Sequence, residues 1–173
     1  MIAISGPAGS GKSTLANKLA ARLLKPHVDL DDVTIPLLHA ARVKDDSAPE
    51  AVLLSELRIE RYQQLAQATR LALIEHGTCI TSAPFTTHLQ QPLIWSSWLD
   101  EVAVPFHSTV VWLDLNSEDR LARMRKRASV RDAALIASAG VLLPASTPVV
   151  KHIRVDARAS LNAQVEYVLG FAL

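Results

Sequence analysis

Residues 6–13, which read GPAGSGKS, limit what this chain can fold into more than any other part of the sequence. A short apolar run at residues 1–4 precedes them, and apolar residues at helical spacing follow over residues 12–24. Glycines let a backbone turn so that successive N–H groups point inward at an anion, and the following helix adds the positive end of its dipole. A strand, a glycine-rich loop and a helix in this order predict a site for the phosphates of a nucleotide.

Individual residues of this loop have different expected roles. Lys12 is expected to reach the β- and γ-phosphates, and the hydroxyl of Ser13 is expected to ligate Mg²⁺. The residues expected to contact the nucleotide are Gly6, Ala8, Gly9, Ser10, Gly11, Lys12, Ser13 and Thr14. A glycine-rich turn with an incidental Lys-Ser pair is the alternative, and the agreement of motif and context disfavours it.

Short apolar runs alternate with helical patterns along the rest of the chain. The further runs predicted as strands are residues 27–30, 78–82, 108–113 and 149–155. The further segments predicted as helices are residues 49–76, 88–101, 118–127, 130–139 and 160–169, with a short helix and a loop over 33–47. Parallel strands need crossover connections, and helices usually provide them. We therefore predict one α/β domain over residues 1–173, a three-layer sandwich with a five-stranded parallel sheet between helices.

The composition is typical of a globular chain. Hydrophobic residues make up 49% and charged residues 20% of 173 residues, and the net charge of +1 gives no overall attraction to nucleic acid or to a membrane. Cys79 is the only cysteine, which excludes an intramolecular disulfide and a cysteine zinc site. No stretch reaches the roughly 18 apolar residues of a spanning helix, and the N-terminus lacks a signal-peptide pattern, so we expect a cytoplasmic protein.

The chain resembles the small P-loop kinases, a group that includes gluconate, shikimate, adenylylsulfate, uridine and nucleoside monophosphate kinases. The resemblance rests on the phosphate loop near residue 1 and on an acidic turn at residues 29–32. It extends to small bacterial ATP-binding P-loop proteins of unassigned substrate through Ala83-Pro84-Phe85 and an arginine-rich segment that ends in Arg131-Asp132. The resemblance implies a P-loop NTPase fold with sheet order 2-3-1-4-5, ATP as the nucleotide, and phosphoryl transfer.

The acidic turn lies beside the phosphate loop in such a fold. If the second strand continues through it, strand alternation puts Asp29 and Asp31 on one side of the sheet. Carboxylates at this edge can bind Mg²⁺ through water or accept the proton of an acceptor hydroxyl. We predict metal contacts from Ser13, Asp29 and Asp31, and the resemblance implies Asp31 as the catalytic base. Asp29 and Asp32 are second choices for contact with metal or substrate, and a solvated acidic turn without function is the alternative.

The third predicted strand departs from a common pattern of P-loop proteins. Many of them carry an aspartate at its end that holds Mg²⁺ through water, whereas this strand ends in Thr81-Ser82. A hydroxyl is a weaker metal partner than a carboxylate. Either Asp29 or Asp31 takes over this role, or catalysis is inefficient.

Arg123, Arg127 and Arg131 recur every four residues and share one face of a predicted helix. Arginines over a γ-phosphate stabilise the charge that spreads over its oxygens during transfer. The resemblance implies a lid within residues 124–147, with Arg127 and Arg131 as catalytic residues and Arg123 as a nucleotide contact. Arg120 and Arg125 are predicted to face solvent, and a basic exposed helix face is the alternative for the whole set.

We predict an ATP-dependent kinase that transfers the γ-phosphoryl group to a hydroxyl or phosphate of a small metabolite. Residues 33–62 are expected to build the acceptor site, where Arg58, Arg61 and Tyr62 are either substrate contacts or ordinary surface residues of a long helix. No guanine-reading Asn-Lys-x-Asp motif follows a late strand, which argues against a GTPase. The alternative function is a nucleotide-binding regulatory protein or slow ATPase without an acceptor. No motif identifies the acceptor itself.

Overall fold

The computed structural model describes residues 1–103, 105–127, 136 and 146–172. Arg131 lies outside the described residues, as do nearly all of the helix predicted over residues 130–139 and most of the lid predicted within 124–147. The predictions for these positions therefore stay predictions.

One parallel sheet forms the centre of the molecule, with its strands in the order β2-β3-β1-β4-β5. The strands are β1 (Ile2–Ser5), β2 (His27–Asp29), β3 (Ile80–Ser82), β4 (Thr109–Asp114) and β5 (Ile153–Asp156). Each of them lies within or next to an apolar run identified in the sequence. The α/β class and the predicted order 2-3-1-4-5 are confirmed.

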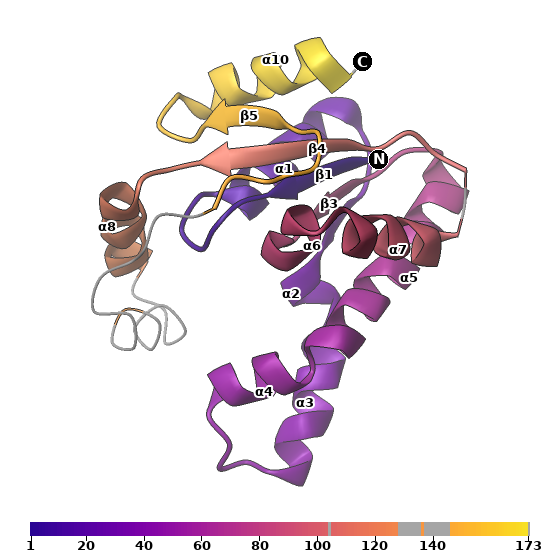
Figure 1. Cartoon of the computed structure of the whole chain (residues 1–173), viewed down its shortest axis with the longest axis vertical. Coiled ribbons are helices and arrows are strands. Elements are labelled where there is room, and N and C mark those ends of the chain that lie inside the picture. Colours follow the sequence, from indigo (N-terminus) through magenta and orange to yellow (C-terminus); the bar gives the residue numbers. More distant parts are fainter. Residues whose placement is uncertain (104, 128–135, 137–145, 173) are drawn as a thin grey trace.

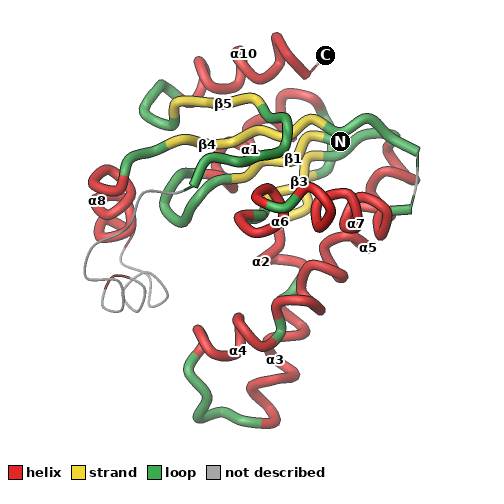
Figure 2. The backbone as a smooth tube through the Cα atoms, in the orientation of Figure 1, coloured by secondary structure: helices red, strands yellow, loops and turns green. Residues whose placement is uncertain are grey.

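Helices cover both faces of this sheet (Figures 1 and 2). On one face, α1 (Lys12–Leu23) and α10 (Leu161–Ala172) pack on Ile2, Ile4 and Val111. On the other face, α5 (Arg58–His76), α6 (Thr86–Gln90) and α7 (Pro92–Val102) pack on Ala3, Val110 and their neighbours. Successive residues of a strand point to opposite faces, so Ile2 and Ile4 belong to one core and Ala3 to the other.

Two predicted helices are divided in the structure. The pattern over residues 49–76 forms α4 (Glu50–Glu56) and α5, and the pattern over 88–101 forms α6 and α7. Pro92 begins α7 because proline has no backbone N–H and fits the first turn of a helix. α4 and α3 (Ile35–Lys44) form an arm that projects from the sheet (Figure 1), joined by an ion pair of 3.0 Å between Arg42 and Glu50.

The arm explains why residues 33–47 show no clear helical pattern in the sequence. α3 has no buried residue, although Ile35 and Val43 belong to it. Apolar periodicity reports the burial of one helix face, so a helix that packs little produces little periodicity. Among the described helices, none is both long enough and apolar enough to cross a bilayer.

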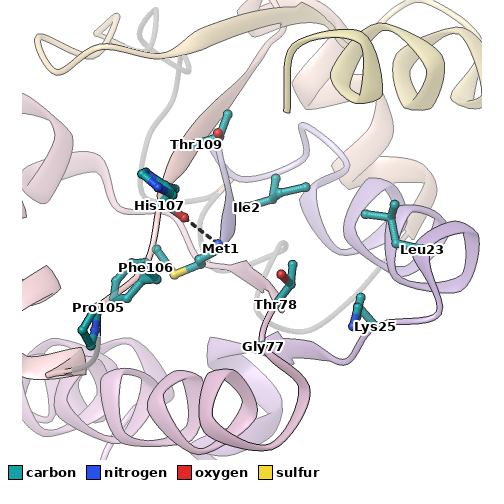
Figure 3. Close-up of a pocket in the computed structure, with 10 residues that line it drawn as sticks. All are labelled: Met1, Ile2, Leu23, Lys25, Gly77, Thr78, Pro105, Phe106, His107 and Thr109. Carbon is teal, nitrogen blue, oxygen red and sulfur yellow. Dashed lines mark hydrogen bonds between the residues drawn. The ribbon is translucent and has the colours of Figure 1, made fainter. Parts of the chain in front are cut away.

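A cavity of about 460 Å³ opens at the amino ends of the strands (Figure 3). Its lining includes Ile2, Thr78 and Thr109, and the amino group of Met1 donates a hydrogen bond of 2.7 Å to the carbonyl oxygen of His107 beside it. Open parallel sheets bind ligands at the carboxyl ends of their strands. This cavity therefore lies at the opposite end of the strands from the phosphate loop, which follows the carboxyl end of β1.

Aromatic rings pack beneath the turn that follows β3. The backbone of Phe85 has a φ of 45°, and its N–H donates to the Tyr62 hydroxyl at 3.1 Å. The indole of Trp98 donates to the carbonyl oxygen of Tyr62 at 3.0 Å, and the His88 ring lies 4.1 Å from the Tyr62 ring. Tyr62 therefore holds the turn at residues 83–85 against α5.

His88 makes the stability of this cluster depend on pH. Burial lowers the pKa of His88 from 6.5 to about 4, and the positive charge of Arg58 adds to this effect. The unfolded chain therefore binds a proton below pH 6.5 that the folded chain binds only near pH 4, so folding stability falls as pH decreases through this window. We expect His88→Phe to lessen that fall, measured by urea unfolding from pH 7 to pH 4.5.

The matched control for this experiment is His76→Phe, because His76 lies on the surface at the end of α5. Carboxylates that stabilise the fold also become protonated in this pH range. The result is therefore the difference in the free energy of unfolding between the wild type and His88→Phe, followed as a function of pH. A difference that does not change with pH would show that His88 is not the group responsible.

Candidate functional site

The phosphate loop depends on glycine at positions where a side chain does not fit. A Cβ on Gly6 would lie 2.7 Å from the Ser10 hydroxyl and 2.9 Å from the carbonyl oxygen of Leu113. A Cβ on Gly9 would lie 3.0 Å from a backbone oxygen of the helix α8 (Ser117–Arg127), and Gly9 has a φ of 79°. Positive φ and close backbone contact together explain why these two positions require glycine.

The loop ends at the first turn of α1. Gly11 precedes this turn and has no side chain that could cap it, so the first N–H groups of α1 point toward the loop without a cap from that residue. Lys12 lies in the same turn, and its ammonium group donates to the carbonyl oxygen of Pro7 at 3.1 Å. The N-terminus of a helix and an ammonium group therefore lie together at the loop, which is the chemistry of a phosphate site.

Ser13 and Asp29 form the centre of the candidate metal site. The Ser13 hydroxyl donates to Oδ2 of Asp29 at 2.7 Å, the Ser82 hydroxyl donates to the same oxygen at 2.7 Å, and the N–H of Asp31 donates to Oδ1 at 2.9 Å. Burial by itself raises the pKa of Asp29, but these three hydrogen bonds outweigh it and hold the pKa below its ordinary value. Asp29 is therefore an ionised carboxylate that accepts a hydrogen bond from Ser13, the residue that follows Lys12.

These groups fit Mg²⁺. Magnesium prefers oxygen ligands, keeps several of its waters, and usually takes one or two protein groups together with substrate phosphates. The Ser13 hydroxyl and the Asp29 carboxylate provide such oxygens at the edge of the phosphate loop. The described residues contain no group of three or more His, Cys, Asp or Glu side chains placed to hold a metal ion.

The structure corrects the geometry that was expected for the acidic turn. The second strand ends at Asp29 and does not continue, and residues Leu30–Val33 form the short helix α2. Asp29 caps this helix through its hydrogen bond from the N–H of Asp31, so strand alternation does not relate the two aspartates. Asp29 and Asp31 still lie together at the carboxyl end of β2. The cap of α2, not a continued strand, places Asp31 beside Asp29.

Arg61 holds Asp31 in this position. Its guanidinium donates to Oδ1 of Asp31 at 2.7 Å and to the Thr34 hydroxyl at 3.1 Å. The Arg61 side chain is only 6% exposed, whereas that of Asp31 is 57% exposed. Arg61 is therefore not a surface residue of α5, and it joins α5 to α2. The sequence signal for this burial is the spacing of four residues between Arg61 and Leu65, which places Arg61 on the buried face of the helix.

Arg120 and Arg123 attach α8 to the outer side of the phosphate loop. Arg120 donates to the carbonyl oxygen of Ala8 at 3.1 Å, and Arg123 donates to the carbonyl oxygens of Ser10 at 3.1 Å and Ala157 at 2.7 Å. The prediction that Arg120 faces solvent is wrong, because its side chain is buried under the loop. Arg125 is exposed, as predicted, and Arg127 is exposed at the last residue of α8.

Comparison with known proteins agrees with this geometry. Residues 1–143 match the family model described as AAA domain. No curated protein sequence matches this chain.

Several solved kinase structures superpose on nearly the whole chain. A gluconokinase from Sinorhizobium meliloti has 16% identity and a TM-score of 0.60, over 98% of this chain and 89% of its own. A sugar kinase from Janibacter sp. has 24% identity and a TM-score of 0.63, over 99% of this chain and 92% of the sugar kinase. The APS kinase of Mycobacterium tuberculosis, in complex with AMPPNP and APS, has 20% identity and a TM-score of 0.63. The match covers 98% of this chain and 94% of the APS kinase. These similarities establish the fold of the small P-loop kinases for this chain.

Proposed function

This chain belongs to the AAA domain family, and we propose that it is an ATP-dependent kinase that phosphorylates a hydroxyl or phosphate of a small metabolite. The observation that carries the proposal is the hydrogen bond of 2.7 Å between Ser13 and Asp29, because it joins the phosphate loop to the acidic turn. The edge of the sheet thus holds groups for a nucleotide and, two residues beyond the helix cap Asp29, the exposed carboxylate of Asp31 for an acceptor. Gluconokinase, sugar kinase and APS kinase structures with this fold support the same class of reaction.

The phosphate-binding side of the proposed reaction consists of the loop, Lys12 and Ser13. The inward N–H groups and the Lys12 ammonium bind the phosphates and neutralise charge that grows on their oxygens during transfer. The Ser13 proton points to Asp29, which leaves the lone pairs of the Ser13 oxygen for Mg²⁺. Bound Mg²⁺ would neutralise phosphate charge and orient the β- and γ-phosphates.

The acceptor side of the proposed reaction consists of Asp31 with Arg61 behind it. The guanidinium is buried and fixes one carboxylate oxygen, while the carboxylate itself is exposed enough to accept a hydrogen bond from an acceptor hydroxyl. Phosphoryl transfer passes through a loose transition state, so this carboxylate mainly orients the hydroxyl and takes its proton late. Arg61 makes Asp31 a rigid acceptor of that hydrogen bond.

We propose that Arg127 and Arg131 reach the γ-phosphate from a lid within residues 124–147. Arg123 is proposed to contact the nucleotide from the end of the loop where it already donates to the carbonyl oxygen of Ser10. Because α8 is attached to the loop through Arg120 and Arg123, a lid that follows α8 starts beside the phosphates. Arginines in such a position stabilise the transferring group.

A regulatory protein or slow ATPase is the second candidate function. The observation that favours it is Ser82, which occupies the end of β3 where a carboxylate would bind the metal through water more strongly. In that case nucleotide would bind and turn over slowly, and no small molecule would accelerate the reaction.

Acceptor-stimulated release of ADP distinguishes the two functions. We expect ATP with Mg²⁺ to bind in calorimetry, and at least one member of a panel of sugar acids, nucleosides, nucleoside monophosphates and other hydroxyl compounds to accelerate ADP release. A coupled assay for ADP measures this, with Lys12→Ala protein as the background. Tight nucleotide binding without acceleration by any compound supports the regulatory alternative, and no binding of ATP or GTP contradicts both functions.

A further inference from the structure

We propose that Asn17, His27 and Ser82 form a positioning chain that orients Asp29 toward Mg²⁺ and replaces the carboxylate that this chain lacks at the end of β3. This inference rests on the metal site of the proposed function. The three residues are not proposed to contact the metal, because each acts through Asp29. They are positioning residues of the site, and we refer to them as the Asn17–His27–Ser82 chain.

Hydrogen bonds connect the chain from the surface of α1 to the buried carboxylate. Nδ1 of His27 lies 2.8 Å from the Asn17 side-chain oxygen, and Nε2 of His27 lies 2.8 Å from the Ser82 hydroxyl. That hydroxyl donates to Oδ2 of Asp29 at 2.7 Å. The side chains of His27 and Asp29 are 10% and 11% exposed, so little water competes for these bonds.

The direction of these bonds follows from the single proton of the serine hydroxyl. That proton points to Asp29, so the Ser82 oxygen must accept a hydrogen bond from the N–H of His27 Nε2. This holds for the neutral and for the charged imidazole, since Nε2 carries a proton in both. The Asn17 amide can accept from Nδ1 or, rotated by half a turn, donate to it. The orientation of Asp29 therefore does not depend on the charge of the ring.

The spacing of residues on α1 and β2 explains why the Ser13–Asp29 and Asn17–His27 contacts form together. Ser13 and Asn17 are one turn apart on α1, which is about 6 Å along a helix. Asp29 and His27 are two residues apart on β2, which is about 6.6 Å along a strand. Ser13 contacts Asp29 and Asn17 contacts His27, so α1 and β2 run antiparallel with matched steps. Ser82 is the register partner of Asp29 on β3 and closes the arrangement.

The same register gives a reason for a serine at position 82. An aspartate there would stand directly beside Asp29 on the neighbouring strand, and two buried carboxylates at this distance repel each other. A hydroxyl that donates to Asp29 instead stabilises the ionised carboxylate. One oriented carboxylate can then serve where other P-loop proteins use an aspartate on the third strand.

Binding of Mn²⁺ to the protein with ADP tests this inference, because the paramagnetic resonance signal of free Mn²⁺ then falls further than it does with ADP alone. We expect Ser82→Ala and His27→Ala to weaken Mn²⁺ binding about five- to tenfold, the effect of one or two lost hydrogen bonds on an ionised group. Binding of ADP without metal should stay unchanged. His27→Gln should recover most of the affinity, since its amide can donate to Ser82.

Two further variants keep the test decisive. His76→Ala is the matched control, an exposed histidine at the last residue of α5, and should bind Mn²⁺ as the wild type does. Asn17 is exposed, so Asn17→Ala is expected to fold even if Ser82→Ala does not, and should weaken Mn²⁺ binding about two- to threefold.

The outcomes separate this inference from the proposed function. If the wild type binds Mn²⁺ with ADP and the Ala variants bind it equally well, the Asn17–His27–Ser82 chain has no positioning role and the proposed function stands. If the wild type binds no Mn²⁺ in the presence of ADP, the metal site itself is wrong and both proposals fall.

Discussion

Replacement of Lys12 by alanine is expected to abolish phosphoryl transfer, with a loss in kcat on the order of 10³-fold or more. Lys12 is the only lysine of the loop, and its ammonium group lies 3.1 Å from the carbonyl oxygen of Pro7 in the same loop. Removing it leaves the developing charge of the transferring group without the lysine cation of the loop. Coupled measurement of ADP release with the acceptor from the panel tests this expectation.

Lys18→Ala is the matched control for this variant. Lys18 lies on the same helix but is exposed, so its removal should leave turnover unchanged. Calorimetry of ATP binding should show weaker binding for Lys12→Ala and unchanged binding for Lys18→Ala. Full turnover by Lys12→Ala would contradict the assignment of the phosphate site.

Replacement of Asp31 by asparagine is expected to lower kcat about 10²-fold. The asparagine oxygen can still accept from Arg61, so the variant removes the charge and basicity of Asp31 without removing its contact to α5. Because the phosphate loop and the Ser13–Asp29 pair stay intact, the KM for ATP should change little. Steady-state kinetics with both substrates separates these two quantities.

Two other aspartates provide controls for Asp31→Asn. Asp100 is exposed on α7, away from the carboxyl edge of the sheet, and Asp100→Asn should turn over normally. Asp32 follows Asp31 in α2 and tests the assignment within the acidic turn. Loss of activity in Asp32→Asn with normal activity in Asp31→Asn would transfer the role of the base to Asp32.

The sequence predicted the architecture because the signals for it are local. Residues 6–13 carry a complete loop motif between a strand and a helix, and the apolar runs for all five strands are visible as short stretches. The order of the strands was predicted from the resemblance to the small P-loop kinases. The apolar runs alone could not predict it, because the sequence of a strand does not say which other strand it pairs with. A short helix was predicted within residues 33–47 and a single helix over 49–76, but not that α3 and α4 form a projecting arm, because α3 buries no residue.

The side-chain partners within the site were less predictable, for a physical reason. Arg120 donates to Ala8, which is 112 residues away in the chain, and Arg61 donates to Asp31, which is 30 residues away. An arginine on a helix looks the same in sequence whether it faces water or a buried carbonyl group. Only the packing of α8 on the loop and of α5 on α2 distinguishes these cases.

The phosphate loop, and with it the prediction of a nucleotide site, was determined by the sequence alone, because eight consecutive residues supply nearly all of its chemistry. The proposed metal site, in contrast, depends on tertiary structure. Its carboxylate is oriented by hydroxyls from α1 and β3 and by a histidine two residues before it, and these groups meet only when β2 pairs with β3 beneath α1. Hydrogen bonds act over about 3 Å, so groups that are far apart in sequence form a site only after the sheet has formed.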